Sequence, residues 1–211
     1  AAVWAVENSR DAIFQAMRRR EAYATSGTRI KLRFFGGWDM PRGACSLGDD
    51  QLLQSAYDSG VPMGGVLPAR EGGAPTFLLQ AAHDAGTTAR PGARLAGAQV
   101  IKLWLDSAGG AHQKVFDLVA PSTSKATVDP KTCKRTGQGV TDICATWQDP
   151  EFKPGQPALY YARVVEDPSC RWSTWLCNQL DPSSRPAGCD STTTQKVIRE
   201  RAWSSAIWYQ P

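Results

Sequence analysis

The sequence contains few of the residues from which catalytic centres are usually built. Its 211 residues include only two histidines, His83 and His112, and neither a Gly-x-Ser-x-Gly motif nor a phosphate-binding loop occurs. Hydrolytic metal sites gather several histidines and carboxylates, and a nucleophilic triad needs a histidine beside its nucleophile. We therefore expect each histidine to be a surface or capping residue, and we expect no metal site and no complete catalytic centre in this chain.

Long hydrophobic runs are also missing, so the sequence predicts no membrane span, and no secretory signal is present. The chain starts at Ala1 with apolar residues and no initiating methionine, which favours a mature or truncated part of a longer protein. A strong charge of one sign is missing as well, because 24 basic residues face 20 acidic ones. The one dense basic run, 18–20, ends a predicted helix, where cations favour the helix dipole. We prefer this explanation to nucleic-acid binding.

The residues that are present indicate a globular, mostly β protein. Hydrophobic residues make up 42% and charged residues 21%, while 8 tryptophans, 14 prolines and 19 glycines indicate many loops and few long helices. Apolar and polar residues alternate with the period of strands in 29–35, 76–82, 99–118, 159–165 and 197–209. Helical patterns occupy 9–23 and 49–59. The pattern over 99–118 predicts a hairpin, and 121–146 is expected to be a long polar connection.

The segment from Tyr23 to Asp39 joins the first predicted helix to the first predicted strand. Ile30, Leu32 and Phe34 fall on one face of that strand, and the chain after it consists of strands and loops with one short helix. Two adjacent glycines, 36 and 37, are expected to stop the strand and to form a bulge or a close backbone approach under Trp38. We expect a mixed α+β fold, mostly β, with an antiparallel, sandwich-like domain.

The six cysteines indicate disulfides. No pair has the close CxxC spacing of a zinc site, and neither histidine lies near a cysteine, so we favour disulfides over metal binding. Disulfides need an oxidising compartment, which predicts a periplasmic or secreted protein. Six cysteines allow 15 connectivities. We expect two short loops closed by neighbouring cysteines, with the other two forming a long-range pair or staying free. The pairs are Cys133 with Cys144 and Cys177 with Cys189, which leaves Cys45 and Cys170.

A turn rich in hydroxyl groups is the first candidate binding site. Thr25, Ser26, Thr28 and Arg29 follow the predicted helix, and their hydroxyls, free amides and guanidinium could together hold an anion or touch a substrate. The alternative is that these residues only cap the helix, and we favour capping for any single one of them.

The second candidate lies between Cys170 and Cys177, where Arg171 accompanies Trp172 and Trp175. Arginine beside two indoles could stack on a sugar or on an aromatic ligand. The alternative, which we favour, is that the tryptophans pack a cysteine-rich loop onto the body of the protein.

Several phrases are long enough to be specific for one family. They are AVWAVENSRDAIFQAMRRREAYATSGTRIKLRFFGGWD, GVPMGG, VDPKTC, YYARVVEDPSCRWSTWLC and QKVIRERAWSSAIWY. Through them the chain resembles, over nearly its whole length, a bacterial family of exported, uncharacterised proteins, the domain-of-unknown-function 3604 family. The resemblance implies that this region is the C-terminal portion of a longer protein. The N-terminal part of that family is similar to the polymerase-and-histidinol-phosphatase metallohydrolases.

The resemblance implies a division of the chain. Residues 1–39 would be the closing helix and strand of an upstream α/β barrel, and residues 40–211 a β-rich C-terminal domain with long disulfide-stapled loops. The divalent metal of the barrel would be held upstream of Ala1, so no cofactor or metal is expected in this chain.

These expectations favour a chain that shapes or covers the active site of a metal-dependent hydrolase-like barrel, its partner within the same protein. The substrate of such a hydrolase and its oligomeric state are open. The main alternative is a disulfide-stapled binding module for carbohydrate or a protein partner, and a third is a purely structural piece.

Overall fold

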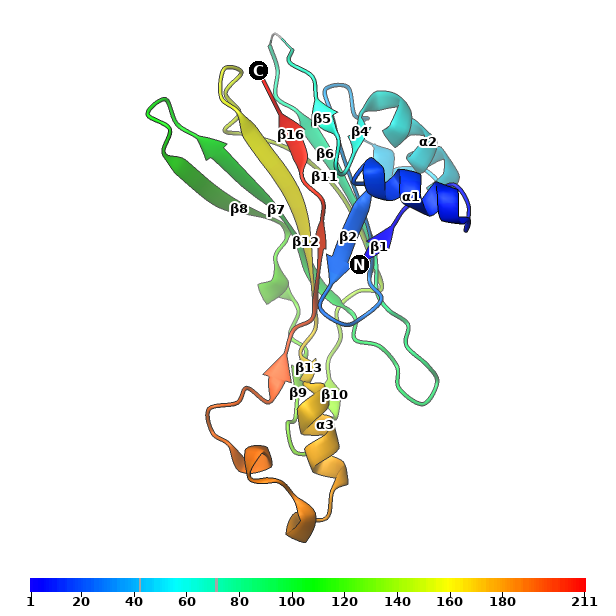
Figure 1. The fold of residues 1–211 in the computed structure, drawn as a ribbon, viewed down its shortest axis with the longest axis vertical. Helices are drawn as coiled ribbons and strands as arrows, with labels where there is room; N and C mark the ends of the chain where they lie inside the picture. The colour runs from blue at the N-terminus through cyan, green and yellow to red at the C-terminus, as the bar shows by residue number, and fades with distance from the viewer. Residues whose placement is uncertain (42, 71) are drawn as a thin grey trace.

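The computed structural model describes residues 1–41, 43–70 and 72–211. Its upper body is a sandwich of two sheets, and a smaller lower lobe, residues 127–136 and 169–198, extends below it (Figure 1). Among the described residues strands exceed helices, and the strands pair mostly antiparallel, which confirms the predicted mixed, mainly β class. No helix in these ranges is long and apolar enough to cross a membrane.

The large sheet is organised around one long central strand. Strand β12 pairs with β7 along one edge and with β15 and β16 along the other. The sheet then extends through β8 beside β7, through β2 and β1 beside β15, and through β5, which runs parallel to β16. The strands of the large sheet are β1 (Ala2–Val3), β2 (Ala22–Thr25), β5 (Val66–Leu67), β7 (Leu95–Leu105), β8 (Ala111–Val119), β12 (Ala158–Glu166), β15 (Arg201–Ser204) and β16 (Ile207–Tyr209).

The small sheet has the order β11-β6-β3-β4 and faces the large one. Its strands are β3 (Lys31–Gly37), β4 (Val61–Pro62), β6 (Thr76–Ala82) and β11 (Asp142–Gln148). The lower lobe holds two small strand pairs, a helix and short 3-10 turns. They are β9 (Thr127–Val128) with β10 (Arg135–Thr136), β13 (Ser169–Cys170) with β14 (Val197–Ile198), α3 (Trp172–Gln179), and the turns Pro182–Ser184 and Ala187–Asp190.

The hydrophobic core lies between the two sheets. Ile30, Leu32 and Phe34, the predicted apolar face of the first strand, are fully buried in it. Opposite them, alternate residues of β12 from Ala158 to Val164 point inward. Because side chains alternate across a strand, Phe35 faces the other way and packs under helix α2 (Asp49–Ser59). This helix has the predicted bounds and covers the outer side of the small sheet.

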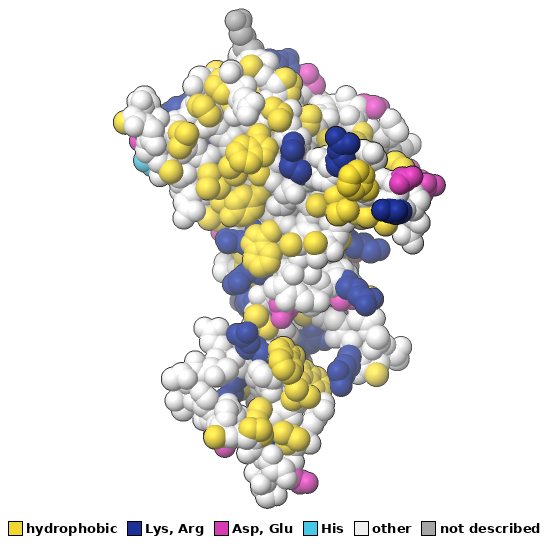
Figure 2. Space-filling view, viewed as in Figure 1, with side chains coloured by type: hydrophobic (Ala, Val, Ile, Leu, Met, Phe, Trp, Pro, Cys, Tyr) yellow, Lys and Arg dark blue, Asp and Glu magenta, His cyan; other side chains and the backbone are white. Residues whose placement is uncertain are grey.

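Among the described residues, the outer side of the large sheet is not covered in the same way, although Ile101 on this side is only 2% exposed. Residues opposite one another across its strands share a face, and the outward rows include Val66–Trp208–Leu159–Leu103 and Tyr161–Ile101–Val115. Val66, Trp208 and Val115 are each more than 40% exposed. Figure 2 shows hydrophobic side chains gathered over this part of the molecule. We call these seven residues the outer apolar face.

The first predicted helix is too long. Helix α1 spans only Arg10–Arg18, with Ser9 as its N-cap, and Ala22–Thr25 is a strand. Strand β2 pairs antiparallel with β15, and Thr25 lies opposite Ala202. This long-range pairing overrides the local helical pattern. Strands β2 and β3 thus pair with strands from the later chain, and the division at residue 39 stays a prediction.

The glycine pair does not end the strand as expected. Strand β3 continues through Gly37. The predicted close approach is present, because a Cβ at Gly37 would lie 2.4 Å from the carbonyl oxygen of Ser59. Its partner is therefore the backbone at the C-terminal end of α2, not the indole of Trp38.

All six cysteines are in disulfides, but two of the expected pairs are wrong. The expected pair Cys177–Cys189 is present, whereas Cys45 bonds Cys144 and Cys133 bonds Cys170. The expectation rested on closeness in sequence, while a disulfide needs Cα atoms about 4.4–6.8 Å apart. β11 brings Cys144 to the turn that carries Cys45, and β13 lies beside the β9–β10 hairpin that carries Cys133. Both pairs have Cα atoms 5.6 Å apart.

Candidate functional site

A cavity of about 720 Å³ lies where the sandwich meets the lower lobe. Five stretches of the chain line it: Thr28 in the turn after β2, the loop 89–93, the hairpin residues 133–135, the chain from the end of β12 through α3, and Glu200 before β15. We call it the interlobe cavity. The charged, hydroxyl-bearing and indole side chains of its wall include those of Thr28, Arg90, Arg135, Glu166, Trp172, Trp175 and Glu200.

Glu166 is the most unusual residue of the cavity wall. It is the last residue of β12, its exposure is 0%, and neither carboxylate oxygen has a hydrogen-bond partner among the described residues. The pKa of Glu166 is raised to about 7, chiefly by burial and to a smaller extent by the negative charges of Glu200 and Asp84. The Thr28 hydroxyl and the Arg135 guanidinium lower it. A buried acid without partners is costly for folding, so it marks a place where a ligand can supply what the protein does not.

The hydroxyl-rich turn is divided between structure and cavity. Thr25 lies in β2 opposite Ala202, and the Ser26 hydroxyl accepts from the backbone N–H of Arg201 at 2.8 Å. The Ser26 hydroxyl also donates to the Glu200 carboxylate. These bonds hold the turn against the start of β15. Neither residue caps a helix, because α1 ends at Arg18 and the turn follows β2.

Of the four predicted residues of the turn, Thr28 alone lines the cavity. Its Oγ1 is buried and makes no hydrogen bond of ordinary geometry, although it is close enough to lower the pKa of Glu166. The backbone N–H of Arg29 donates to Asp84 at 2.8 Å. The turn therefore faces carboxylates, an environment that favours a positive charge over an anion.

Helix α3 provides the aromatic wall of the cavity. Trp172 and Trp175 are three residues apart, so they lie on one side of the helix, and their side chains remain 73% and 40% exposed. Arg171 is the N-cap of α3 and does not line the cavity. The arginine that stacks on an indole is Arg90, whose guanidinium carbon lies 5.5 Å from the Trp175 ring centre.

The fold thus joins the two sites that the sequence suggested separately, through Thr28 from one and the two tryptophans from the other. Sequence reasoning missed Glu166, Glu200 and Arg90. A signal for Glu166 does exist, because a charged residue directly ends the apolar strand sequence ALYYARVV. Arg199, next to Glu200, also has a buried nitrogen without a partner, but it does not line the cavity.

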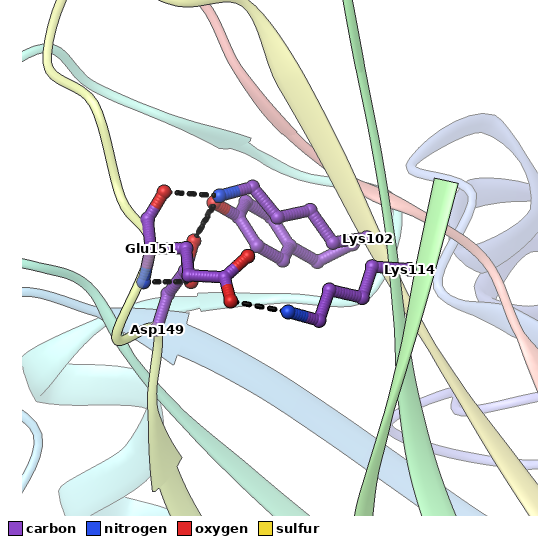
Figure 3. A network of polar contacts seen from close by, with 5 residues as sticks. Lys102, Lys114, Asp149 and Glu151 are labelled. Atoms are coloured by element: carbon purple, nitrogen blue, oxygen red, sulfur yellow. Dashed lines mark hydrogen bonds and ion pairs between the residues drawn. The ribbon is translucent and has the colours of Figure 1, made fainter. Parts of the chain in front are cut away.

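A second cluster of buried charges lies inside the sandwich (Figure 3). The Lys102 ammonium, from β7, donates to Asp149 at 2.5 Å and to the Glu151 carbonyl at 2.9 Å. Asp149 also accepts from the Tyr160 hydroxyl at 2.7 Å and from the Glu151 backbone N–H at 2.9 Å. Every charge in this cluster has a partner, so we assign it to the stability of the fold.

Within the described ranges, no group of three His, Cys, Asp or Glu residues is arranged to hold a metal ion. His83 contacts the carbonyl oxygen of Thr141 at 3.1 Å, and His112 contacts Asp106 at 2.7 Å and stacks on Trp104. Each histidine contacts residues of the sandwich, and neither lines the interlobe cavity.

Comparisons with known proteins give one match. A family model described as "Protein of unknown function (DUF3604)" matches residues 1–211. No curated protein and no solved structure matches the chain.

Proposed function

The chain belongs to the DUF3604 family of proteins of unknown function, and we propose that it binds a small polyhydroxylated ligand, such as a carbohydrate, in the interlobe cavity. The observation that carries this proposal is the unpartnered, fully buried carboxylate of Glu166 in the cavity wall.

The chemistry of the wall suits a sugar. Glu166 and Glu200 offer acceptors, Arg90 and Arg135 offer donors, and the indole of Trp175 offers an apolar plate. Sugar rings present hydroxyls around their edge and C–H groups on their faces, so they need both kinds of surface. A volume of about 720 Å³ lies within the range of small-molecule sites.

Intrinsic tryptophan fluorescence tests this binding function. Titrating the chain with a panel of mono- and disaccharides should give a saturable change, and Trp175→Ala should abolish it. Trp208→Ala is the matched control, since Trp208 is 43% exposed against 40% for Trp175 but lies on the outer apolar face. Flat titrations across the panel would contradict the proposal, as would an unchanged response in Trp175→Ala.

A second candidate function is the one implied by the family resemblance. In it, the chain packs on an N-terminal, metal-dependent hydrolase-like barrel of the same protein and shapes its entrance. The outer apolar face favours this role, because a soluble domain rarely leaves both faces of a sheet apolar without covering them. Helix α1 adds Phe14 and Met17, each more than half exposed.

The barrel would bring the divalent metal and the catalytic residues, and this chain would contribute contacts only. Its three disulfides suggest an oxidising environment outside the cytoplasm, and we propose the periplasm or secretion.

Two measurements address this second function. The sequence encoded upstream of Ala1 should contain His-x-His-type metal motifs, and an upstream region without them would refute the hydrolase assignment.

In the intact protein, hydrogen exchange of the backbone amides of Leu159 and Leu103 should be slower than in the 211-residue chain. Equal exchange would show that the outer apolar face is not covered by the barrel.

A further inference from the structure

We propose that the interlobe cavity selects a ligand that carries a positively charged amino group on its polyhydroxylated ring, that is, an amino sugar, with the ammonium placed against Glu166. This inference rests on the proposed binding function and narrows it to a chemical class.

The carboxylate of Glu166 needs hydrogen-bond donors. Both of its oxygens are buried, and neither accepts a hydrogen bond of ordinary geometry from the described residues. A ligand hydroxyl would satisfy an oxygen but would leave the negative charge uncompensated in a dry site. An ammonium has three N–H donors and the opposite charge, and hydrogen bonds between two ionised groups are about twice as strong as neutral ones. A charged amine therefore gains more from this position than a hydroxyl does.

The charged groups around Glu166 favour a cation. The carboxylates of Glu200 and Asp84 act on it with the same sign, and the guanidinium of Arg135 acts with the opposite sign. Arg135 is also engaged, since its Nη2 donates to the carbonyl oxygen of Pro91 at 2.6 Å. Two carboxylates and one guanidinium therefore act on Glu166, and the second guanidinium of the wall, Arg90, lies over Trp175. This surplus of negative charge around Glu166 favours a cation there.

The two indoles of α3 provide the surface for the ring of the ligand. Trp172 and Trp175 line the same cavity from α3, and both indoles are partly exposed. Indole faces bind the C–H face of a sugar, and they also attract cations, as Arg90 over Trp175 shows within the chain itself. A simple amine would contact only Glu166, whereas an amino sugar would contact both Glu166 and the indoles of α3.

The ionisation of Glu166 supports the assignment. With a pKa of about 7, Glu166 is mostly protonated at pH 6 and mostly ionised at pH 8. The site should therefore hold an ammonium more tightly as the pH rises from 6 toward 7. Above pH 7 the gain should fade, because the amine of a 2-amino sugar itself loses its proton. A neutral sugar should show no such increase.

Isothermal titration of the chain with D-glucosamine and D-glucose tests the proposal. At pH 7 the wild-type chain should bind glucosamine about tenfold or more tightly than glucose, from one added charge-assisted contact. Glu166→Gln keeps the shape but removes the charge, and it should reduce this preference to about threefold or less. Glu151→Gln, the same substitution at an exposed site of the sandwich, should leave the preference unchanged.

Two outcomes would overturn the amino-sugar assignment, and a third would overturn carbohydrate binding itself. Equal affinity of the wild-type chain for glucosamine and glucose overturns the amino-sugar assignment and leaves carbohydrate binding standing. A preference that survives in Glu166→Gln also overturns the assignment, because the selectivity would then come from elsewhere. Absence of binding for both sugars and for the whole panel overturns the binding function itself.

Discussion

The ion pair of Lys102 with Asp149 should be one of the most sensitive points of the sandwich. The two side chains are 4% and 0% exposed, and they lie 2.5 Å apart between the sheets. A few residues away, Lys114 and Glu151 form a second pair whose side chains are 46% and 47% exposed. Figure 3 shows both pairs in one view. The two pairs differ mainly in burial, so they allow the effect of burial to be measured within one protein.

Lys102→Met removes the ammonium and leaves the Asp149 carboxylate buried. The carboxylate keeps the Tyr160 hydroxyl and the Glu151 backbone N–H as donors, but its charge is no longer balanced. Removing one partner of a buried pair typically costs about 3–5 kcal/mol. We expect about 3 kcal/mol here, because the two remaining hydrogen bonds each retain about 1 kcal/mol or more.

The double variant Lys102→Met, Asp149→Asn removes both charges and keeps an oxygen at position 149 for Tyr160. Replacing a whole buried pair by groups of similar volume is often close to neutral. We therefore expect the double variant to regain most of the lost stability and to lie within about 1 kcal/mol of the wild-type chain. The exposed counterpart, Lys114→Met, should cost less than about 1 kcal/mol.

Urea unfolding with the disulfides intact, followed by tryptophan fluorescence, measures these free energies. Purified monomeric variants with equal m-values should be compared, since a changed m-value would signal a changed unfolded state. A Lys102→Met variant as stable as Lys114→Met would refute the argument that burial makes this pair critical. A double variant no more stable than Lys102→Met would refute the argument that unbalanced charge is the cause.

Three further outcomes are expected. Replacing Cys45 and Cys144 together by alanine should cost about 2–5 kcal/mol, near the upper end because the disulfide closes 99 residues, and thiol counting in denaturant should find no free thiol in the wild-type chain. Glu166→Gln should stabilise the chain at pH 8 by up to about 3 kcal/mol and should have little effect at pH 4.5. The reason is that the pKa of Glu166 is higher in the folded than in the unfolded chain, so the wild-type chain loses stability as the pH rises from about 4.5 to 7. Equal gains at both pH values in urea unfolding would contradict this. Gly37→Ala should destabilise by more than about 1 kcal/mol, since its Cβ would meet Ser59, whereas Gly43→Ala has open space; equal melting temperatures would refute the close approach.

Local patterns predicted the elements with clear periodicity. Strand β6 and helix α2 have the predicted bounds, and the hairpin of β7 and β8 covers the predicted region. In each of these, apolar spacing or capping chemistry agrees with the tertiary structure. The helix in the lower lobe was missed, because α3 is short and has no side-chain cap, so its sequence carries no start signal.

The candidate site could be predicted only in pieces. The sequence indicated Thr28 by its hydroxyl-rich turn and the two tryptophans by their place between cysteines. It did not indicate that they share a cavity, since some 140 residues of chain lie between them. Glu166 looked like an ordinary charged end of a strand, because its burial depends on the lobe packed beside it.

The sequence by itself determined the β class of this protein, its apolar core face and the oxidation of its cysteines, because alternation and composition act over a few neighbouring residues. The tertiary structure decided which cysteines pair, that β2 leaves the helix to join β15, and that Thr28, Glu166 and Trp175 meet. Each of these depends on strands brought together from distant parts of the chain, and no local pattern records which distant partner a strand will find.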